Sequence, residues 1–223
     1  MNGTRLAIAV LGIGALLAGV SYLRKETVAD SHRQARQLVV HYTLSRLDQP
    51  IVIVGDSLTE ASTLPRTYCG HPVIDAGLNG ASTSSDLGTW LIEALDGRRA
   101  SAILVALGTN DALLEHSGQD FETSYAALLA QLAKVTDHLA VLGIPAIEVR
   151  GRVSAELQKQ AMGRIDAFNA LLPALAGKSG ASFVALPPMP APHTIDGVHL
   201  DAAGYAVWDD AVLKGASGAC SKP

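Results

Sequence analysis

The sequence is poor in residues that would point to metal, redox or nucleic-acid chemistry. It has only two cysteines, Cys69 and Cys220, which are too few for a zinc site of their own and lack the Cys-x-x-Cys spacing of redox proteins. Its net charge is −4 and no long basic run occurs, so we expect no nucleic acid as a partner. By themselves, the two thiols could form a disulfide or remain free.

Several nucleotide, metal and hydrolase motifs are also missing. No Gly-x-x-x-x-Gly-Lys-Ser/Thr loop or Gly-x-Gly-x-x-Gly turn follows a predicted strand, which argues against nucleotide or flavin binding. The absence of Gly-x-Ser-x-Gly excludes the usual nucleophile signature of α/β-hydrolases, and the absence of His-Glu-x-x-His excludes a common helical zinc site. We therefore predict neither a cofactor nor a metal.

The N-terminus carries a long uncharged run over residues 6–23, between Arg5 and the pair Arg24 and Lys25. A helix of this length spans roughly 27 Å, which is short for a transmembrane segment but close to the hydrocarbon thickness. We interpret 1–23 as a membrane anchor or signal segment, with a buried core helix as a further alternative. The anchor would hold the domain on the extracytoplasmic (periplasmic) side, although the charge rule favours the opposite orientation. A cleaved signal would instead release a secreted or periplasmic protein.

Residues 24–50 predict a linker helix, because their apolar side chains fall roughly on one stripe and Pro50 ends the pattern. The catalytic or binding domain is then expected over 51–214, followed by a short tail over 215–223. This length suits one compact domain with an appendage better than two domains.

Within this domain, strand-like and helix-like stretches alternate. The predicted strands are 51–54, 73–76, 102–107, 146–149 and 182–186. A helix begins near Ser57, and others are predicted through Trp90 and Leu95 with a cap within 82–85, then over 121–142, 155–175 and 201–213. This order predicts an α/β protein, a three-layer α/β/α domain with a five-stranded parallel sheet. The first and last helices can lie on one face of such a sheet, so a Cys69–Cys220 disulfide is our hypothesis.

Ligand sites in parallel sheets form at the carboxyl ends of the strands. Polar or glycine-rich segments stand at those ends or in the following loops: Gly55-Asp56-Ser57, Gly77-Leu78-Asn79-Gly80, Gly108-Thr109-Asn110-Asp111 and Asp196-Gly197-Val198-His199. Together they supply a hydroxyl, backbone donors, an amide, a carboxylate and an imidazole, which are the groups that acyl transfer needs. Any one of them in isolation would more often be a cap, a turn residue or a surface histidine. We expect Asp111 and Asp201 to cap helices.

In these four segments the sequence resembles the GDSL or SGNH hydrolase family, over about residues 51–214. Gly55-Asp56-Ser57-Leu58 matches the block whose serine is the nucleophile, and Asp196-Gly197-Val198-His199-Leu200 matches the block whose aspartate and histidine complete the triad. The resemblance implies Ser57, Asp196 and His199 as catalytic residues. It also implies a flavodoxin-like fold with five parallel strands.

The two remaining blocks imply an oxyanion hole. Leu78-Asn79-Gly80-Ala81-Ser82 matches the block whose glycine lends a backbone N–H, and we assign this role to Gly80 rather than to its rival Gly77. Gly108-Thr109-Asn110-Asp111 matches the block whose asparagine lends a side-chain N–H, which implies Asn110. The backbone N–H of Ser57 would be the third donor.

By this resemblance the protein is expected to be a serine esterase or lipase that cleaves carboxylic esters of small molecules, glycans or lipids through an acyl-enzyme. One alternative is an acyltransferase or deacetylase that acts on envelope glycans with the same triad. Another is a non-catalytic binding module of the same fold. We expect the loops over 58–69, 112–120 and 187–192 to form the rim of the pocket.

Overall fold

The computed structural model describes residues 31–220, and the predicted anchor or signal over 1–23 lies outside them. That segment and the location it implies therefore stay predictions. Within the described part, no helix combines the length and the apolar character needed to cross a membrane. Residues 31–44 are helical, and one compact unit runs from Val40 onward. Val40 and Leu44 of this helix are buried in its core, although the sequence assigns them to a linker.

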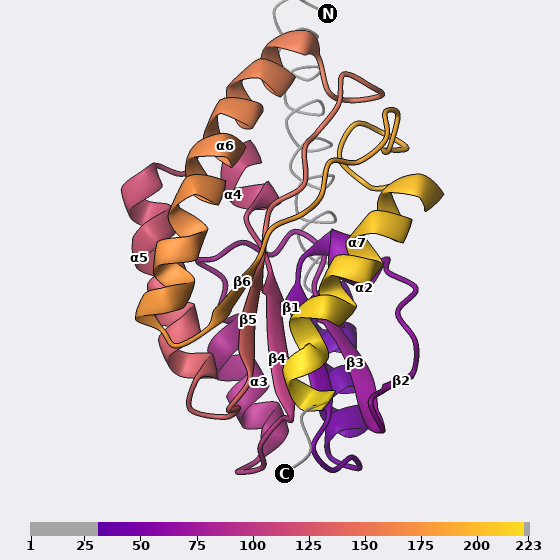
Figure 1. The fold of residues 1–223 in the computed structure, drawn as a ribbon, viewed down its shortest axis with the longest axis vertical. Coiled ribbons are helices and arrows are strands. Elements are labelled where there is room, and N and C mark those ends of the chain that lie inside the picture. Colours follow the sequence, from indigo (N-terminus) through magenta and orange to yellow (C-terminus); the bar gives the residue numbers. More distant parts are fainter. Residues whose placement is uncertain (1–30, 221–223) are drawn as a thin grey trace, which may run out of the picture. The chain divides into compact units, whose positions relative to one another are not determined.

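The core of this unit is a six-stranded sheet, which confirms the α/β class (Figure 1). The strands lie in the order β2-β3-β1-β4-β5-β6, and all pairs are parallel except β2 with β3. Their bounds are Ile51–Gly55 (β1), Thr67–Tyr68 (β2), His71–Gly77 (β3), Ala102–Ala106 (β4), Leu139–Leu142 (β5) and Ser182–Val184 (β6). The prediction of five strands is wrong by one, because two-residue β2 adds an antiparallel edge too short to leave a sequence pattern.

Counted along the chain, the five parallel strands lie in the order second, first, third, fourth, fifth, which is the flavodoxin-like order. The order reverses between β1 and β4. At such a switch point the chain leaves two neighbouring strands in opposite directions, so a crevice opens beyond their carboxyl ends. Segments that follow β1 and β4 are therefore placed to line a site.

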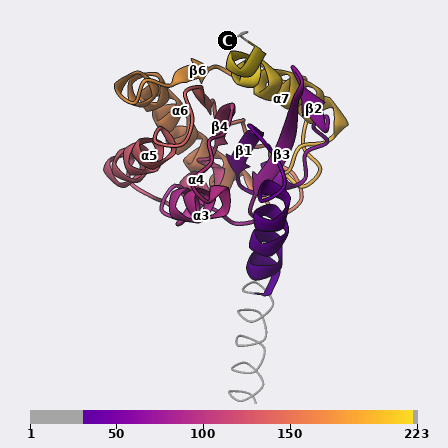
Figure 2. The same ribbon diagram turned by 90° about the horizontal axis from the view of Figure 1, so that it is seen from below.

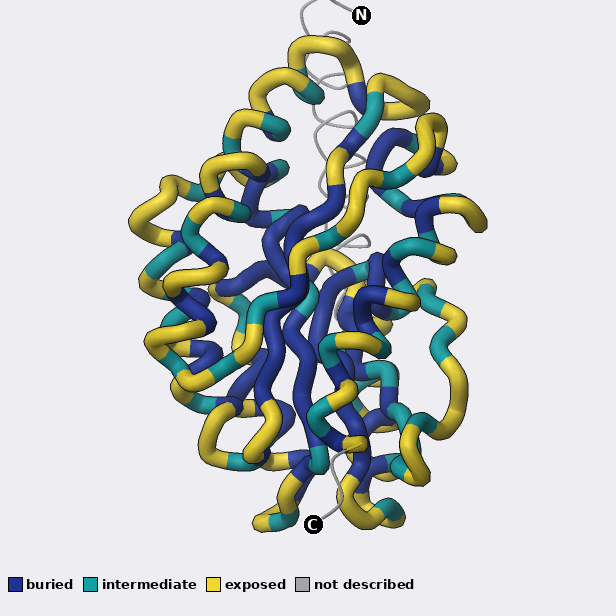
Figure 3. Tube along the Cα trace, viewed as in Figure 1, coloured by how far each residue is buried: buried dark blue, intermediate teal, exposed yellow. Residues whose placement is uncertain are grey.

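The central strands are buried on both faces, and alternate residues belong to two different cores. In β1, Val52 and Val54 pack into one core with α3 (Leu87–Leu95), α5 (Gly118–Leu132) and α6 (Ala155–Lys178). Ile51 and Ile53 pack into the other core with α7 (Ala202–Gly215) and the 3₁₀ helix η1 (Ala216–Cys220). Figure 2 shows α7 on one face of the sheet and α3 and α5 on the other, and Figure 3 shows the strands as the buried interior. These are the three layers that the sequence predicts.

The structure corrects the predicted elements around the fourth parallel strand. The helix predicted over 121–142 ends at Leu132, and the strand predicted over 146–149 lies at Leu139–Leu142. All four residues of β5 are buried, so the run has no alternation that would distinguish it from the end of a buried helix. Similarly, α3 begins at Leu87 after Asp86, which makes no side-chain cap, and not within the Ser/Thr cluster at 82–85.

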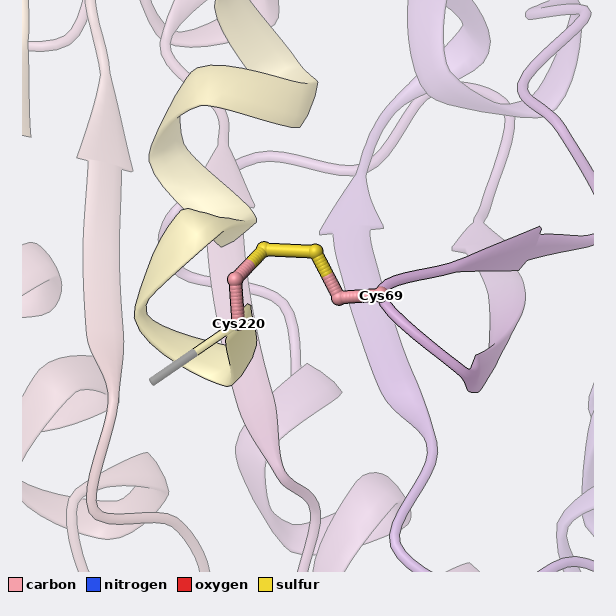
Figure 4. Close-up of a disulfide and its surroundings, with 2 residues drawn as sticks. All are labelled: Cys69 and Cys220. Carbon is pink, nitrogen blue, oxygen red and sulfur yellow. A yellow bond between two sulfur atoms is a disulfide. The ribbon is translucent and has the colours of Figure 1, made fainter. Parts of the chain in front are cut away.

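The disulfide hypothesis is confirmed. Cys69 and Cys220 are bonded, with their Cα atoms 5.1 Å apart. Cys69 lies in the tight connection between β2 and β3, not in a helix, and Cys220 ends η1 (Figure 4). The bond therefore joins the edge of the sheet to the C-terminal end of the described chain.

Candidate active site

The structure brings three of the predicted residues into one hydrogen-bonded chain. Ser57 Oγ lies 3.0 Å from His199 Nε2, and His199 Nδ1 lies 2.9 Å from Asp196 Oδ2. Ser57 follows β1, whereas Asp196 and His199 belong to the loop between β6 and α7. The Ser57 hydroxyl thus meets an imidazole that lies 142 positions later in the chain, together with its neighbouring carboxylate, at the carboxyl edge of the sheet.

Ser57 is held at a sharp corner between β1 and the short helix α2 (Ser57–Glu60). Oδ1 of the Asp56 carboxyl group accepts a hydrogen bond from the Leu58 backbone N–H at 2.9 Å, which caps the helix and turns the chain. Gly77, at the end of β3, lies against this corner: a methyl group there would overlap the backbone nitrogen of Glu60. Gly77 therefore serves close packing.

Asp196 is positioned by its own loop. Its Oδ1 accepts hydrogen bonds from the backbone N–H groups of Val198 and His199 at 3.1 and 2.9 Å. Partial burial raises the pKa of Asp196, but the hydrogen bonds from the His199 backbone and ring and from Val198 outweigh it and hold the pKa below its ordinary value. Asp196 is thus a carboxylate at neutral pH, and its Oδ2 can accept a hydrogen bond from His199 when Nδ1 carries the proton.

Asn110 and Gly80 follow the ends of two other strands, β4 and β3. Asn110 lies in α4 (Thr109–Leu113) after β4, and its amide donates to the Ala81 carbonyl at 2.8 Å. A side-chain amide has two N–H bonds, so one is left for a ligand. Within residues 31–220, the backbone N–H groups of Ser57 and Gly80 have no hydrogen-bond partner.

A buried carboxylate links the two segments that carry these donors. Asp111 is fully buried and accepts hydrogen bonds from the backbone N–H and hydroxyl of Thr83 and a contact from His116 Nδ1 at 3.0 Å. The expectation that Asp111 caps a helix is wrong, because the residue lies inside α4 and its side chain reaches a different segment. Asp201 does cap α7, by accepting from Ala203 and Gly204.

A pocket of about 370 Å³ opens over these groups. Its polar lining includes Ser57, Asn79, Asn110 and His199, and its apolar lining comes from Leu113, Val153, Leu157 and Val198. The pocket is thus partly apolar beside the hydroxyl, which suits a small acyl group. Of the predicted rim, only the loop over 112–120 contributes, through Leu113; Pro187, Pro188 and Met189 line a separate groove beside α6.

Sequence reasoning missed one charged residue of this pocket, Arg152. Its Nη2 lies 3.0 Å from Asp196 Oδ2 and 3.1 Å from His199 Nδ1. A sequence pattern could have indicated it, since Arg150-Gly151-Arg152 follows the strand predicted over 146–149 as polar and glycine residues follow the other predicted strands. Among the described residues, no group of three or more His, Cys, Asp or Glu side chains could hold a metal ion.

The fold and the site together define a class: an α/β protein with a flavodoxin-like sheet and a serine, an imidazole and a carboxylate in contact at the switch point. The model of the GDSL-like lipase/acylhydrolase family matches residues 53–207. The chain belongs to this family, which confirms the resemblance and supports ester hydrolysis as its general activity. A search of the curated proteins found no match.

Solved structures share the fold at low sequence identity. A putative platelet activating factor from Streptococcus pneumonia is 21% identical, with a TM-score of 0.69 over 88% of this chain and 96% of that chain. Axe2, an acetylxylan esterase from Geobacillus stearothermophilus, is 15% identical, with a TM-score of 0.57 over 75% and 94%. LAE5, an alpha/beta hydrolase enzyme from the metagenome of Lake Arreo, is 18% identical, with a TM-score of 0.56 over 78% and 97%.

Proposed function

We propose that the protein hydrolyses carboxylic esters through an acyl-enzyme intermediate on Ser57. The observation that carries the proposal is the continuous contact from Ser57 Oγ through both nitrogens of His199 to Asp196 Oδ2. A serine hydroxyl is a weak nucleophile until a base takes its proton, and this arrangement supplies the base together with the group that orients it.

In the first half of the reaction, Ser57 Oγ attacks the ester carbonyl carbon while His199 Nε2 takes the hydroxyl proton. The intermediate collapses when the bond to the alcohol oxygen breaks and His199 returns the proton to that oxygen. In the second half, water attacks the acyl-enzyme, His199 takes a proton from it, and the carboxylic acid leaves as Ser57 recovers its proton. Throughout the reaction, Asp196 accepts a hydrogen bond from the Nδ1–H group of His199 and stabilises the imidazolium that forms.

The developing negative charge on the carbonyl oxygen needs hydrogen-bond donors. The Ser57 and Gly80 backbone N–H groups and the second N–H of the Asn110 amide are the donors that we assign to it. The hydrogen bond from the Thr83 N–H to Asp111 supports this assignment, because it fixes the segment that carries Asn110 relative to the segment that carries Gly80. The Asp-x-x-His spacing of Asp196 and His199 also occurs in Axe2, between an aspartate and a histidine whose alanine variants are catalytic mutants.

The proposal is tested by fluorophosphonate labelling and by hydrolysis of para-nitrophenyl acetate. We expect Ser57→Ala to lose labelling, Ser57→Ala and His199→Ala each to lower kcat by about 10⁴-fold or more, and Asn110→Ala to lower it about 10²–10³-fold. Ser84→Ala is the matched control, because it removes an exposed hydroxyl whose hydrogen bond, among residues 31–220, is to Ser82 alone. Undiminished labelling of Ser57→Ala would contradict the proposal.

A further inference from the structure

Arg152 places a permanent positive charge beside the proposed catalytic groups. Of the described residues that line the pocket, it alone carries a fixed charge. Its Nη2 lies 3.1 Å from His199 Nδ1, and the opposite ring nitrogen lies 3.0 Å from Ser57 Oγ. The guanidinium is therefore separated from the nucleophile by one imidazole ring and two contacts of hydrogen-bond length.

The backbone that carries Arg152 is fixed against the loop of Asp196 and His199. The Val153 N–H donates to the Arg150 carbonyl at 2.9 Å and closes a tight turn around Gly151 and Arg152. Gly151 and Gly197 both have positive φ, +57° and +97°, and each faces the backbone of the other loop so closely that a methyl group would overlap it. The turn can thus approach the loop only because both positions lack a side chain.

Asp196 does not need Arg152 for its orientation. Its Oδ1 already accepts two backbone N–H groups, and its Oδ2 accepts the His199 ring. Because His199 Nδ1 donates its hydrogen to Asp196, it cannot also accept a hydrogen bond from Arg152 Nη2. The contact between Nη2 and Nδ1 therefore brings two donors together and is not a hydrogen bond. Since the Asp196 carboxylate already accepts these hydrogen bonds, its orientation does not explain why an arginine lies beside it.

The guanidinium also retains unused donors that face solvent. Its side chain is 63% exposed, and only Nη2 has a polar contact within residues 31–220. Nε and Nη1 therefore remain for a ligand. A guanidinium fork matches a carboxylate with two parallel hydrogen bonds, and partial neutralisation by Asp196 suits a singly charged group better than a doubly charged one.

We infer that Arg152 binds a carboxylate on the alcohol portion of the substrate, so that the pocket selects esters of an anionic alcohol. This inference rests on the proposed function. His199 Nε2 must face the departing oxygen to return the proton, so the alcohol lies beside the His199 ring, and Arg152 lies at the other nitrogen of that ring. The acyl carbonyl points instead toward Asn110 and Gly80.

The test compares two acetate esters that differ only in charge, meta-acetoxybenzoate and meta-acetoxybenzamide. We expect Arg152→Gln to lower kcat/KM for the benzoate about 10-fold or more and to change the benzamide less than about 3-fold, since a hydrogen bond to a charged group is lost only with the first. Arg152→Lys should fall between, because an ammonium is a point charge without the fork. The product meta-hydroxybenzoate should inhibit Arg152→Gln more weakly than the parent.

Arg99→Gln is the matched control for loss of one positive charge. Arg99 precedes β4 at the amino end of the sheet, where it contacts Lys134 and Asp137, and its loss should leave both esters unchanged. Equal losses on both esters in Arg152→Gln would mean that Arg152 only supports the triad, and would overturn the inference. A second comparison uses the para-nitrophenyl half-ester of adipic acid, whose charge lies on the acyl side, and its uncharged monoamide. The inference would also be overturned if Arg152→Gln lowered kcat/KM only for this half-ester and not for meta-acetoxybenzoate.

Failure of the proposed function gives a different result. If Ser57 is not the nucleophile, Ser57→Ala keeps parental activity toward both acetates. If only the inference about Arg152 fails, Ser57→Ala loses both activities while Arg152→Gln affects the two esters equally.

Discussion

At the scale of single residues, the carboxyl group next to the proposed nucleophile has an unusual environment. Asp56 is 1% exposed, and its Oδ2 has no hydrogen-bond partner among the described residues. Burial, and to a lesser degree repulsion from Asp111, raise the pKa of Asp56 to about 7, although the hydrogen bond from Leu58 opposes the change. The capping bond uses only Oδ1, which a neutral amide can also provide.

This raised pKa predicts a pH dependence of stability. In the unfolded chain an aspartate ionises near pH 4, so between about pH 4 and pH 7 folding takes up a proton. The free energy of unfolding contributed by Asp56 therefore falls as pH rises through this window and is constant above it. Asp56→Asn keeps the cap and removes the ionisation, so we expect the fall to disappear when urea unfolding is measured at pH 5 and pH 8.

The control for this prediction is Asp201→Asn, which makes the same change at the N-cap of α7. Asp201 is partly exposed and accepts from two backbone N–H groups. We expect this variant to retain the fall between pH 5 and pH 8. A fall of unchanged size in Asp56→Asn would show that Asp56 ionises normally in the folded protein.

At the scale of elements, the loop of Asp196 and His199 has no helix or strand to hold it and depends on a neighbouring segment. Glu148 Oε2 accepts hydrogen bonds from the backbone N–H groups of His193 and Thr194 at 3.1 and 2.9 Å and from the Thr194 hydroxyl. Arg150 donates to the Thr194 carbonyl, and the Glu148 N–H donates to Gly197 at 2.8 Å. The segment after β5 therefore holds the loop in place through Glu148 and Arg150.

Loss of the hydrogen bonds that Glu148 accepts from this loop should reduce both the stability of the protein and its turnover. Glu148→Ala leaves the backbone N–H groups of two buried residues, His193 and Thr194, unpaired, so we expect the free energy of unfolding to fall by about 2–3 kcal/mol. Turnover of para-nitrophenyl acetate should also fall, because His199 and Asp196 lose a support of their loop. Glu122→Ala removes an exposed carboxylate that contacts Lys178 at 3.3 Å and should change stability by less than about 1 kcal/mol. If the two variants are equally stable and active, the loop does not depend on Glu148.

At the scale of the whole molecule, the disulfide joins two residues that are 151 positions apart in the sequence. The segment between them carries β3 to β6 and the loop of Asp196 and His199, whereas β1 and Ser57 precede it. Such a crosslink restricts the unfolded chain more than the folded one. It joins the antiparallel edge at β2 and β3 to the end of η1, which packs with α7 on one face of the sheet. Disulfides persist in oxidising compartments, and the extracytoplasmic location of the domain stays a prediction.

Removal of this crosslink should lower stability without rearranging the site. We expect the double variant Cys69→Ser, Cys220→Ser to lose about 2–4 kcal/mol in urea unfolding. Reductant should lower the stability of the parent by a similar amount and leave the double variant unchanged. A parent that is insensitive to reductant under unfolding conditions would contradict this prediction.

The sequence by itself determined the α/β class, most of the parallel strands and the four segments that the family shares, because local patterns encode them. Apolar runs identify β1, β3, β4 and β6, and glycine or polar residues mark where such runs end. Ser57, Asn110, Asp196 and His199 could be named because each lies in a short motif.

Only the tertiary structure decided the place of β5, the role of Gly77, the disulfide and the position of Arg152. A strand buried on both faces has no period, so 139–142 could not be distinguished from the end of a helix. Arg152 reaches the site through the contact of two loops, at Gly151 and Gly197, that are far apart in the chain. Contacts of this kind depend on how the whole sheet is wound, and no local pattern records them.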